Sequence, residues 1–264
     1  MTERKGSKLN RLERELPEGL LVTAKWMSEH SYSTALRTQY VAAGWLEQPV
    51  RGVFRRTRGS INWQQVVISL QMLLDEPLVV GGRTALEAQG YGHYLSQKVT
   101  EVHLYGPKRP PVWLGALNAG ARFVAHNSAR LFPEAMGAYR PTTDTVTEPW
   151  GQWDWPLVMS CPERAVVELL DELPARESFH QVDKLFEGLS ALSPRRLQPL
   201  LTSCRNVKVK RLFFFFADRH KHAWLKRLDK SAVDFGRGKR KLVDGGRLDP
   251  TYLITVPEDL DGVR

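Results

Sequence analysis

The sequence predicts an α+β fold, in which a small helical head with a β-hairpin precedes a larger mixed α/β domain that holds a small, mostly antiparallel sheet. Helical spacing of apolar residues fills the first 45 positions, and alternating apolar residues begin at Val99. Amphipathic helices return after Cys161. The 264 residues are 42% hydrophobic and 25% charged, which is enough for one large or two modest globular domains.

The head is predicted to contain three helices and a hairpin. Thr23 and Ser33 are suited to cap the second and third helices, and Gly44 is suited to end the third. The hairpin follows over residues 45–56, with its turn near Pro49–Gly52. The predicted helices lie near Ser7–Leu16, Ala24–Glu29 and Thr34–Ala43.

This order of elements is typical of a winged helix-turn-helix, so we assign residues 1–60 to such a DNA-binding domain and residues 61–264 to a second domain. A further division near residue 190 stays open. The third helix offers short polar groups and one guanidinium to the major groove, from Ser33, Thr34, Arg37, Thr38 and Gln39. The hairpin offers cations to phosphates or the minor groove, from Arg51, Arg55, Arg56 and Arg58.

Two of these side chains suggest specific base contacts. Arg37 is suited to chelate a guanine, and Gln39 is suited to pair with an adenine. The alternative is a helical module for protein contact, whose arginines lie on a solvated hairpin. The sequence favours DNA binding because the whole chain is basic, with a net charge of +9.

The middle of the chain is predicted to form a buried helix and then the sheet. Residues 63–75 are apolar on most faces, and the glycine pair at 81–82 reads as a tight turn because no phosphate-loop motif accompanies it. Pro162 is suited to open a helix over Ala165–Leu173, with Glu163 in a capping box with Ser160. The candidate strands are residues 99–105, 112–114, 122–126, 143–147 and 155–160.

Charge is distributed unevenly along the chain. Residues 1–60 hold 11 Lys/Arg and 6 Asp/Glu, residues 61–194 hold 10 and 15, and residues 195–264 hold 17 and 8. Each end of the chain is therefore expected to present a basic surface. A solvated face without a partner is the simpler alternative for the C-terminal end.

The C-terminal region combines apolar and basic residues. Four phenylalanines at 213–216 cover every side of a helix predicted over Val207–Leu228, so this helix should lie inside a core, and a last strand is expected at Tyr252–Val256. The nearby cations are expected to contact nucleic acid or an acidic protein partner. These candidate partner-binding residues are Lys208, Lys210, Arg211, Arg219, Lys221, Arg237, Lys239, Arg240 and Lys241.

Several classes of protein are disfavoured. Two cysteines, Cys161 and Cys204, form neither a disulfide framework nor a zinc cluster by themselves. No apolar run is long enough for a membrane span or a signal peptide, so we expect a cytoplasmic protein without a membrane partner.

No catalytic motif is recognisable, so we expect no catalytic residues, no cofactor and no metal. A nuclease-like enzyme that uses Glu101, Asp144 and Lys108 stays as the least favoured alternative.

Two short motifs carry a resemblance to a known family. GGRTAL at residues 81–86 and PERA at residues 162–165, in this order after the basic head, resemble the AbiEi family of antitoxins from type IV toxin–antitoxin systems. The likeness runs from about residue 5 to about residue 255 and includes no catalytic signature.

The resemblance implies an antitoxin and repressor in abortive infection and phage defence. It implies a head that binds double-stranded operator DNA upstream of its own operon. It also implies a C-terminal domain that opposes a nucleotidyltransferase toxin of the AbiEii kind, directly or indirectly. A stand-alone winged-helix regulator is the alternative.

Overall fold

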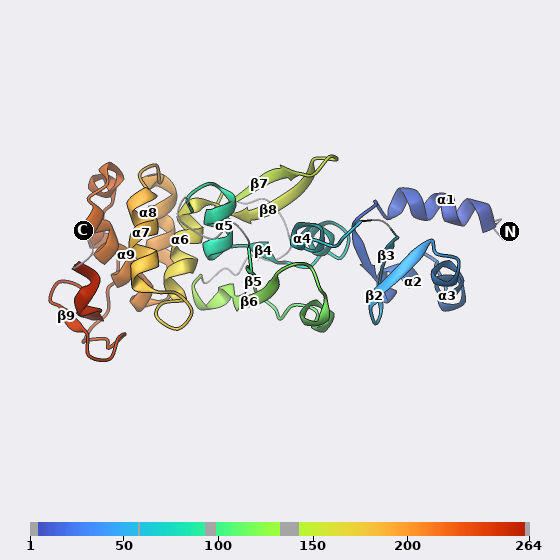
Figure 1. The fold of residues 1–264 in the computed structure, drawn as a ribbon. Helices are drawn as coiled ribbons and strands as arrows, with labels where there is room; N and C mark the ends of the chain where they lie inside the picture. The colour runs from blue at the N-terminus through green and yellow to red at the C-terminus, as the bar shows by residue number, and fades with distance from the viewer. Residues whose placement is uncertain (1–4, 58, 93–98, 133–142, 262–264) are drawn as a thin grey trace.

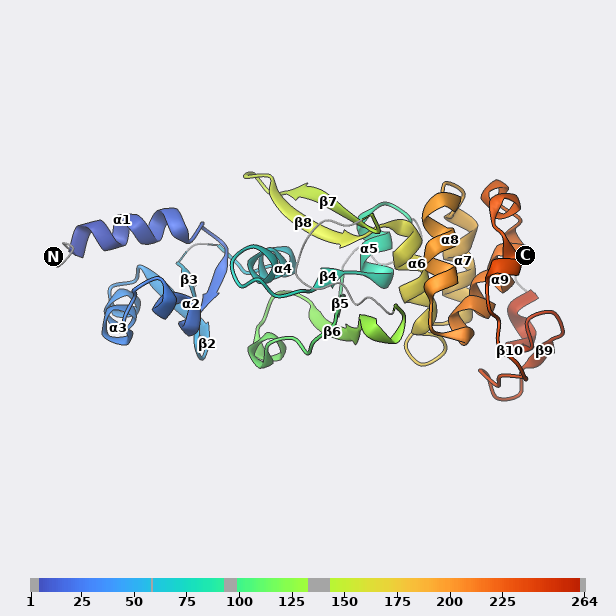
Figure 2. The same ribbon diagram turned by 180° about the vertical axis from the view of Figure 1, so that it is seen from behind.

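The elements follow one another along the long axis of an elongated molecule (Figures 1 and 2). The computed structural model describes residues 5–57, 59–92, 99–132 and 143–261. The head lies at one end, a five-stranded sheet lies in the middle, and four helices separate this sheet from the C-terminal strands at the other end.

The head contains the three predicted helices and the hairpin, together with one strand that was not predicted. The boundaries of α2 are as predicted, and α3 ends one residue early. The apolar bridge after the first helix forms β1, which pairs antiparallel with β3, so the order of this sheet is β1-β3-β2. The elements are α1 (Lys5–Glu15), β1 (Leu21–Thr23), α2 (Ala24–Glu29), α3 (Thr34–Ala42), β2 (Leu46–Val50) and β3 (Val53–Arg56).

The predicted caps begin α2 and α3. The Thr23 hydroxyl accepts a hydrogen bond from the Trp26 backbone N–H at 3.2 Å, and the Ser33 hydroxyl accepts one from Leu36 at 3.3 Å. Each cap therefore satisfies one of the free N–H groups at the start of its helix.

The head is joined through buried contacts to residues 61–264, here called the body. The backbone N–H of Leu21 donates to the hydroxyl of Ser69 on α4 (Trp63–Met72) at 2.8 Å, and Gly19 lies against Gln65 and Trp155. Removing the head would therefore expose parts of α4 and Trp155 that are covered in the intact chain.

The central sheet is mixed, which corrects the predicted mostly antiparallel sheet. Its order is β6-β5-β4-β8-β7, and two of its four strand pairings, β4–β8 and β5–β6, are parallel. Alternating apolar residues do not reveal strand direction, and residues 107–121 between β5 and β6 are long enough for a parallel crossover. The strands are β4 (Val79–Val80), β5 (Glu101–Gly106), β6 (Arg122–Asn127), β7 (Thr145–Trp150) and β8 (Trp155–Ser160).

One predicted strand of this region is wrong. Residues 112–114 belong to a 3-10 helix, Val112–Ala116, that begins directly after Pro110 and Pro111. Of these three residues only Leu114 is fully buried, whereas Trp113 is partly buried against the core and Val112 is 97% exposed. The prolines remove the N–H groups that a strand pairing would need.

Helices α6 to α9 form a layer beside the sheet, and α5 (Gly82–Ala88) packs against α6 (Figure 1). Helix α9 ends at His220 because Lys221 adopts a left-handed conformation with φ of 53°, so the longer predicted helix is wrong at its C-terminal end. Helix α7 was not predicted. The bounds are α6 (Pro162–Asp171), α7 (Phe179–Gly188), α8 (Pro194–Ser203) and α9 (Val207–His220).

The four phenylalanines of α9 lie in the core, as predicted. Phe213, Phe214 and Phe216 are fully buried and Phe215 is 8% exposed. The chain then ends in a small antiparallel pair, β9 (Arg247–Asp249) and β10 (Ile254–Val256). Within the described ranges, no helix combines the length and apolar character of a membrane span.

Candidate functional site

The solvent-facing side of α3 carries short, uncharged side chains, three of them polar. Thr34, Ala35, Thr38, Gln39 and Ala42 are all exposed, and their spacing places them along one stripe of the helix. Thr38 donates its hydroxyl to the Thr34 carbonyl at 3.1 Å. These are side chains that can enter a groove without steric obstruction.

Arg37 occupies the opposite side of α3, which disagrees with its predicted contact to guanine. It is 8% exposed. Its guanidinium donates to the Ala24 carbonyl, the Ser28 hydroxyl, the Tyr32 carbonyl and the Thr34 hydroxyl, at 2.8–3.2 Å. This side chain holds α3 against α2, and its burial keeps its guanidinium away from the surface that a base could reach.

The hairpin arginines have three different environments. Arg51 is exposed at the turn between β2 and β3. Arg55 is 5% exposed and pairs with Glu47, so it is unavailable to phosphate. Arg56 is half-buried and lies 3.6 Å from Glu13, whereas Arg58 lies outside the described residues.

The basic residues of the C-terminal region are also divided by burial. Lys210 and Arg211 are 4% and 2% exposed, so they do not belong to the predicted surface. Lys208 donates to the carbonyls of Asp171 and Leu173, and Arg219 pairs with Asp183 at 2.9 Å. Five of the nine stay exposed, namely Lys221, Arg237, Lys239, Arg240 and Lys241.

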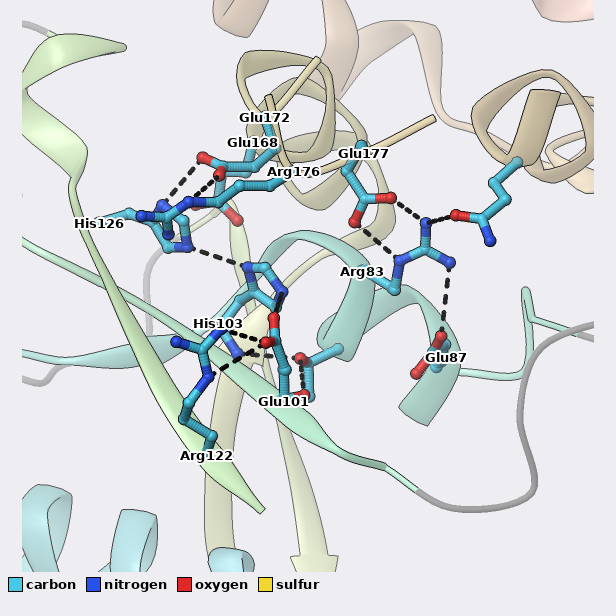
Figure 3. Close-up of polar contacts among 12 residues, drawn as sticks. Arg83, Glu87, Glu101, His103, Arg122, His126, Glu168, Glu172, Arg176 and Glu177 are labelled. Carbon is cyan, nitrogen blue, oxygen red and sulfur yellow. Dashed lines mark hydrogen bonds and ion pairs between the residues drawn. The ribbon is translucent and has the colours of Figure 1, made fainter. Parts of the chain in front are cut away.

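A series of contacts between ring nitrogens and carboxylates, here called the relay, connects β5, β6 and the end of α6 (Figure 3). His103 Nδ1 lies 2.9 Å from His126 Nε2, and His126 Nδ1 lies 2.9 Å from Glu172. His103 Nε2 lies 3.9 Å from Glu101. Because the Glu172 carboxylate only accepts, His126 donates to it, and His103 then donates to His126.

Burial decides the charge of this relay. Burial lowers the pKa of His103 from 6.5 to about 4, and the neighbouring His126 adds to the lowering. Burial alone would raise the pKa of Glu172, but the hydrogen bond from His126 and nearby cations lower it. The relay therefore holds a neutral His103 and an ionised Glu172 at neutral pH.

The buried His103 should make the stability of the chain depend on pH. Unfolded His103 binds a proton below about pH 6.5 and the folded one only below about pH 4, so the free energy of unfolding should fall as the pH drops through this window, by about 3 kcal/mol. Urea unfolding of the wild type and of His103→Gln between pH 7 and pH 4 measures the difference, which the variant should lack.

His180→Gln is the matched control for this prediction. The His180 side chain is 41% exposed, and its replacement should leave the pH profile unchanged. Parallel curves for the wild type and His103→Gln would show that the buried ring is not responsible.

The residues of the nuclease-like alternative are distributed over separate contacts. Glu101 pairs with Arg122 on β6, Asp144 pairs with Arg164 on α6 at 3.2 Å, and Lys108 is exposed. Over the described ranges, no group of three or more His, Cys, Asp or Glu side chains has a geometry suited to a metal ion.

Comparison with protein families decides which family this is. Residues 99–257 match a family described as transcriptional regulator, AbiEi antitoxin, type IV TA system. Residues 5–97 match the AbiEi antitoxin N-terminal domain of such regulators. The chain belongs to the AbiEi antitoxin family. No curated protein matches this AbiEi chain significantly.

A solved structure shares the fold of this AbiEi chain. The crystal structure of the RV2827C protein from Mycobacterium tuberculosis superposes with a TM-score of 0.56 at 16% sequence identity. The match covers 94% of this chain and 89% of the other. At this identity the likeness concerns the fold alone.

The two motifs that carry the family resemblance meet in one contact. The backbone N–H of Gly82 donates to the buried Glu168 carboxylate at 3.0 Å, and Arg164 of the PERA motif donates to the same carboxylate at 2.7 Å. Arg83 reaches across to Glu177 with its Nε at 2.7 Å (Figure 3). In this AbiEi chain the motifs therefore fix α5 against α6.

Glu163 of the PERA motif does not form the predicted capping box. Its carboxylate accepts from the backbone N–H of Ser193 at 2.7 Å and lies 3.7 Å from Arg196. Cys161, not Ser160, is the N-cap of α6. Glu163 therefore caps the start of α8, a contact over 30 positions that local sequence rules do not reveal.

Proposed function

We propose that this AbiEi chain represses its own operon by binding operator DNA through a winged helix-turn-helix head, and that its body opposes a nucleotidyltransferase toxin of the AbiEii kind. The observation that carries the proposal is the exposed, uncharged stripe on α3, next to a three-stranded sheet whose turn exposes Arg51. Family membership supports the antitoxin role.

The side chains on α3 favour a half-site that contains A·T pairs. The Gln39 amide can donate to and accept from one adenine, and the methyl groups of Ala35 and Thr38 suit the methyl group of thymine. Arg37 is engaged within the head, so α3 presents no guanidinium to a guanine. Arg51 at the hairpin turn is suited to a phosphate contact, which adds affinity without sequence preference.

The body is proposed to act without catalysis. Its polar groups form fixed internal pairs such as Arg164 with Glu168, and α5 and α6 give it a rigid frame. The exposed cations near the C-terminus, Lys221, Arg237, Lys239, Arg240 and Lys241, are the proposed contact for a polyanionic or acidic partner.

The two roles can be tested in one strain. A reporter driven by the upstream region of the gene measures repression, and growth during expression of the adjacent nucleotidyltransferase measures neutralisation. Thr38→Ala with Gln39→Ala in the intact chain should abolish repression and preserve growth rescue. Loss of rescue by this variant, with normal folding, would refute the division of roles. Absence of a toxin gene beside it would favour a stand-alone regulator.

Point variants are preferable to removal of residues 1–60. Because Leu21 bonds to Ser69 and Gly19 lies against Trp155, a truncated chain would lack contacts that cover the body. A loss of function after truncation would therefore not separate the roles of the two parts.

A further inference from the structure

A polar hollow lies between the sheet and the last helices, apart from the head. Its volume is 610 Å³, within the usual range for small-molecule sites. Five separate segments line it: the end of β5, β6 with the turn that follows, the end of α6, the start of α9, and the C-terminal loop. The lining includes five cations, Arg130, Arg176, Arg205, Lys208 and Arg240.

The two carboxylates of the hollow are already neutralised. Asp171 accepts from the Asn206 amide at 2.7 Å and lies 3.6 Å from Lys208 Nζ. Glu172 accepts from His126 at 2.9 Å and lies 3.8 Å from Arg176. These pairs engage Lys208 and Arg176, so the positive charge of the hollow resides in the remaining arginines.

Those arginines are exposed and nearly free. Among the residues that the structure describes, the Arg130 and Arg240 side chains have no hydrogen-bond or ion-pair partner, and Arg205 engages only the Ala129 carbonyl at 3.3 Å. Three guanidiniums without ion-pair partners line the same hollow, so an anion bound there would reduce the repulsion between their charges.

A buried cation near Arg240 increases the positive potential. Arg211 is 2% exposed, and its guanidinium donates to the carbonyls of Phe235, Gly238 and Leu253. Burial lowers the pKa of Arg211, and the nearby Arg240 lowers it further, so the two guanidiniums lie close to each other.

We propose that this hollow binds the oligophosphate group of a nucleotide, held by Arg130, Arg205 and Arg240. Guanidiniums match phosphate oxygens in pairs, and three of them balance the charge of a diphosphate and offset most of the charge of a triphosphate. The concave shape suits a compact ligand that several chain segments surround. The site is separate from the proposed reading head, so its test does not depend on DNA binding.

Calorimetric titration of the intact wild-type chain with ATP, GTP, CTP, UTP and inorganic pyrophosphate tests the proposal at fixed ionic strength. We expect dissociation constants in the micromolar range for at least one nucleoside triphosphate, and no binding of adenosine, which lacks phosphate. If pyrophosphate binds as tightly as the nucleoside triphosphates, the site would be one for free oligophosphate, and the proposal of a nucleotide ligand would be overturned.

Arg130→Ala with Arg240→Ala should weaken nucleotide binding at least tenfold. Lys226→Ala with Arg227→Ala is the matched control, because it removes two exposed cations that do not line the hollow, and binding should change less than twofold. Equal losses in both variants would indicate unspecific attraction and overturn the site. No nucleotide binding by the wild type at millimolar concentration would also overturn it.

Discussion

Thr38→Ala combined with Gln39→Ala should weaken binding to the operator duplex by about 2 kcal/mol, or roughly 30-fold, with little effect on a scrambled duplex. The reason is that these exposed side chains of α3 offer base contacts but take no part in the core. Fluorescence anisotropy titrations with both duplexes at one salt concentration measure the two affinities. An equal loss on both duplexes would show that α3 does not read bases.

Arg37→Ala should give the opposite pattern. Its guanidinium bonds to four oxygens inside the head and lies 5.9 Å from the ring of Phe54, so its removal should lower the free energy of unfolding by about 3 kcal/mol. Affinity for operator and scrambled duplex should then fall together. A loss of affinity for the operator alone, with an unchanged free energy of unfolding, would instead support the contact between Arg37 and a guanine that the sequence suggested.

Gly81→Ala should destabilise the body by about 3 kcal/mol. A Cβ atom at this position would overlap the Glu168 carboxylate and lie 2.5 Å from Tyr105 Cδ2, and both side chains are buried. Displacing Glu168 would also break its bonds to Gly82 and Arg164 and leave buried charges without partners. Urea unfolding of the purified variant measures the loss.

Gly115→Ala is the matched control for this substitution. Nothing lies within 4 Å of a Cβ built there, so the free energy of unfolding should change by less than about 0.5 kcal/mol. If Gly81→Ala unfolds at the same urea concentration as Gly115→Ala, the close packing of α5 on α6 does not control stability.

The elements that sequence could predict are those specified by local rules. The caps at Thr23 and Ser33 and the apolar spacing between them place α2 and α3 almost to the residue. The four phenylalanines of α9 predict a buried helix because no face of that helix is left for solvent.

Contacts between residues far apart in the sequence account for what could not be predicted. Alternating apolar residues do not show whether neighbouring strands run parallel, so the parallel pairings of β4 with β8 and of β5 with β6 are known only from the structure. Glu163 bonds to Ser193 across α6 and α8, a partner that no local motif indicates.

The same limit applies to the candidate sites. A basic residue in the sequence is not a basic surface, because Arg37, Lys210 and Arg211 are buried among backbone carbonyls and helices. Conversely, Arg130 and Arg205 were not predicted as binding residues. They are 75 positions apart in sequence, and the contact between the segment after β6 and the start of α9, where the Arg205 N–H donates to the Leu131 carbonyl at 2.8 Å, brings them to one hollow.

The most direct test of a DNA-reading head is titration of the intact chain with the duplex from upstream of its own gene, alongside a scrambled duplex of equal length and composition. The arrangement of α3 and the hairpin turn predicts at least tenfold tighter binding to the upstream duplex, with affinity for both falling as salt is raised. Equal affinity for the two duplexes, or no binding to either at low salt, would contradict it.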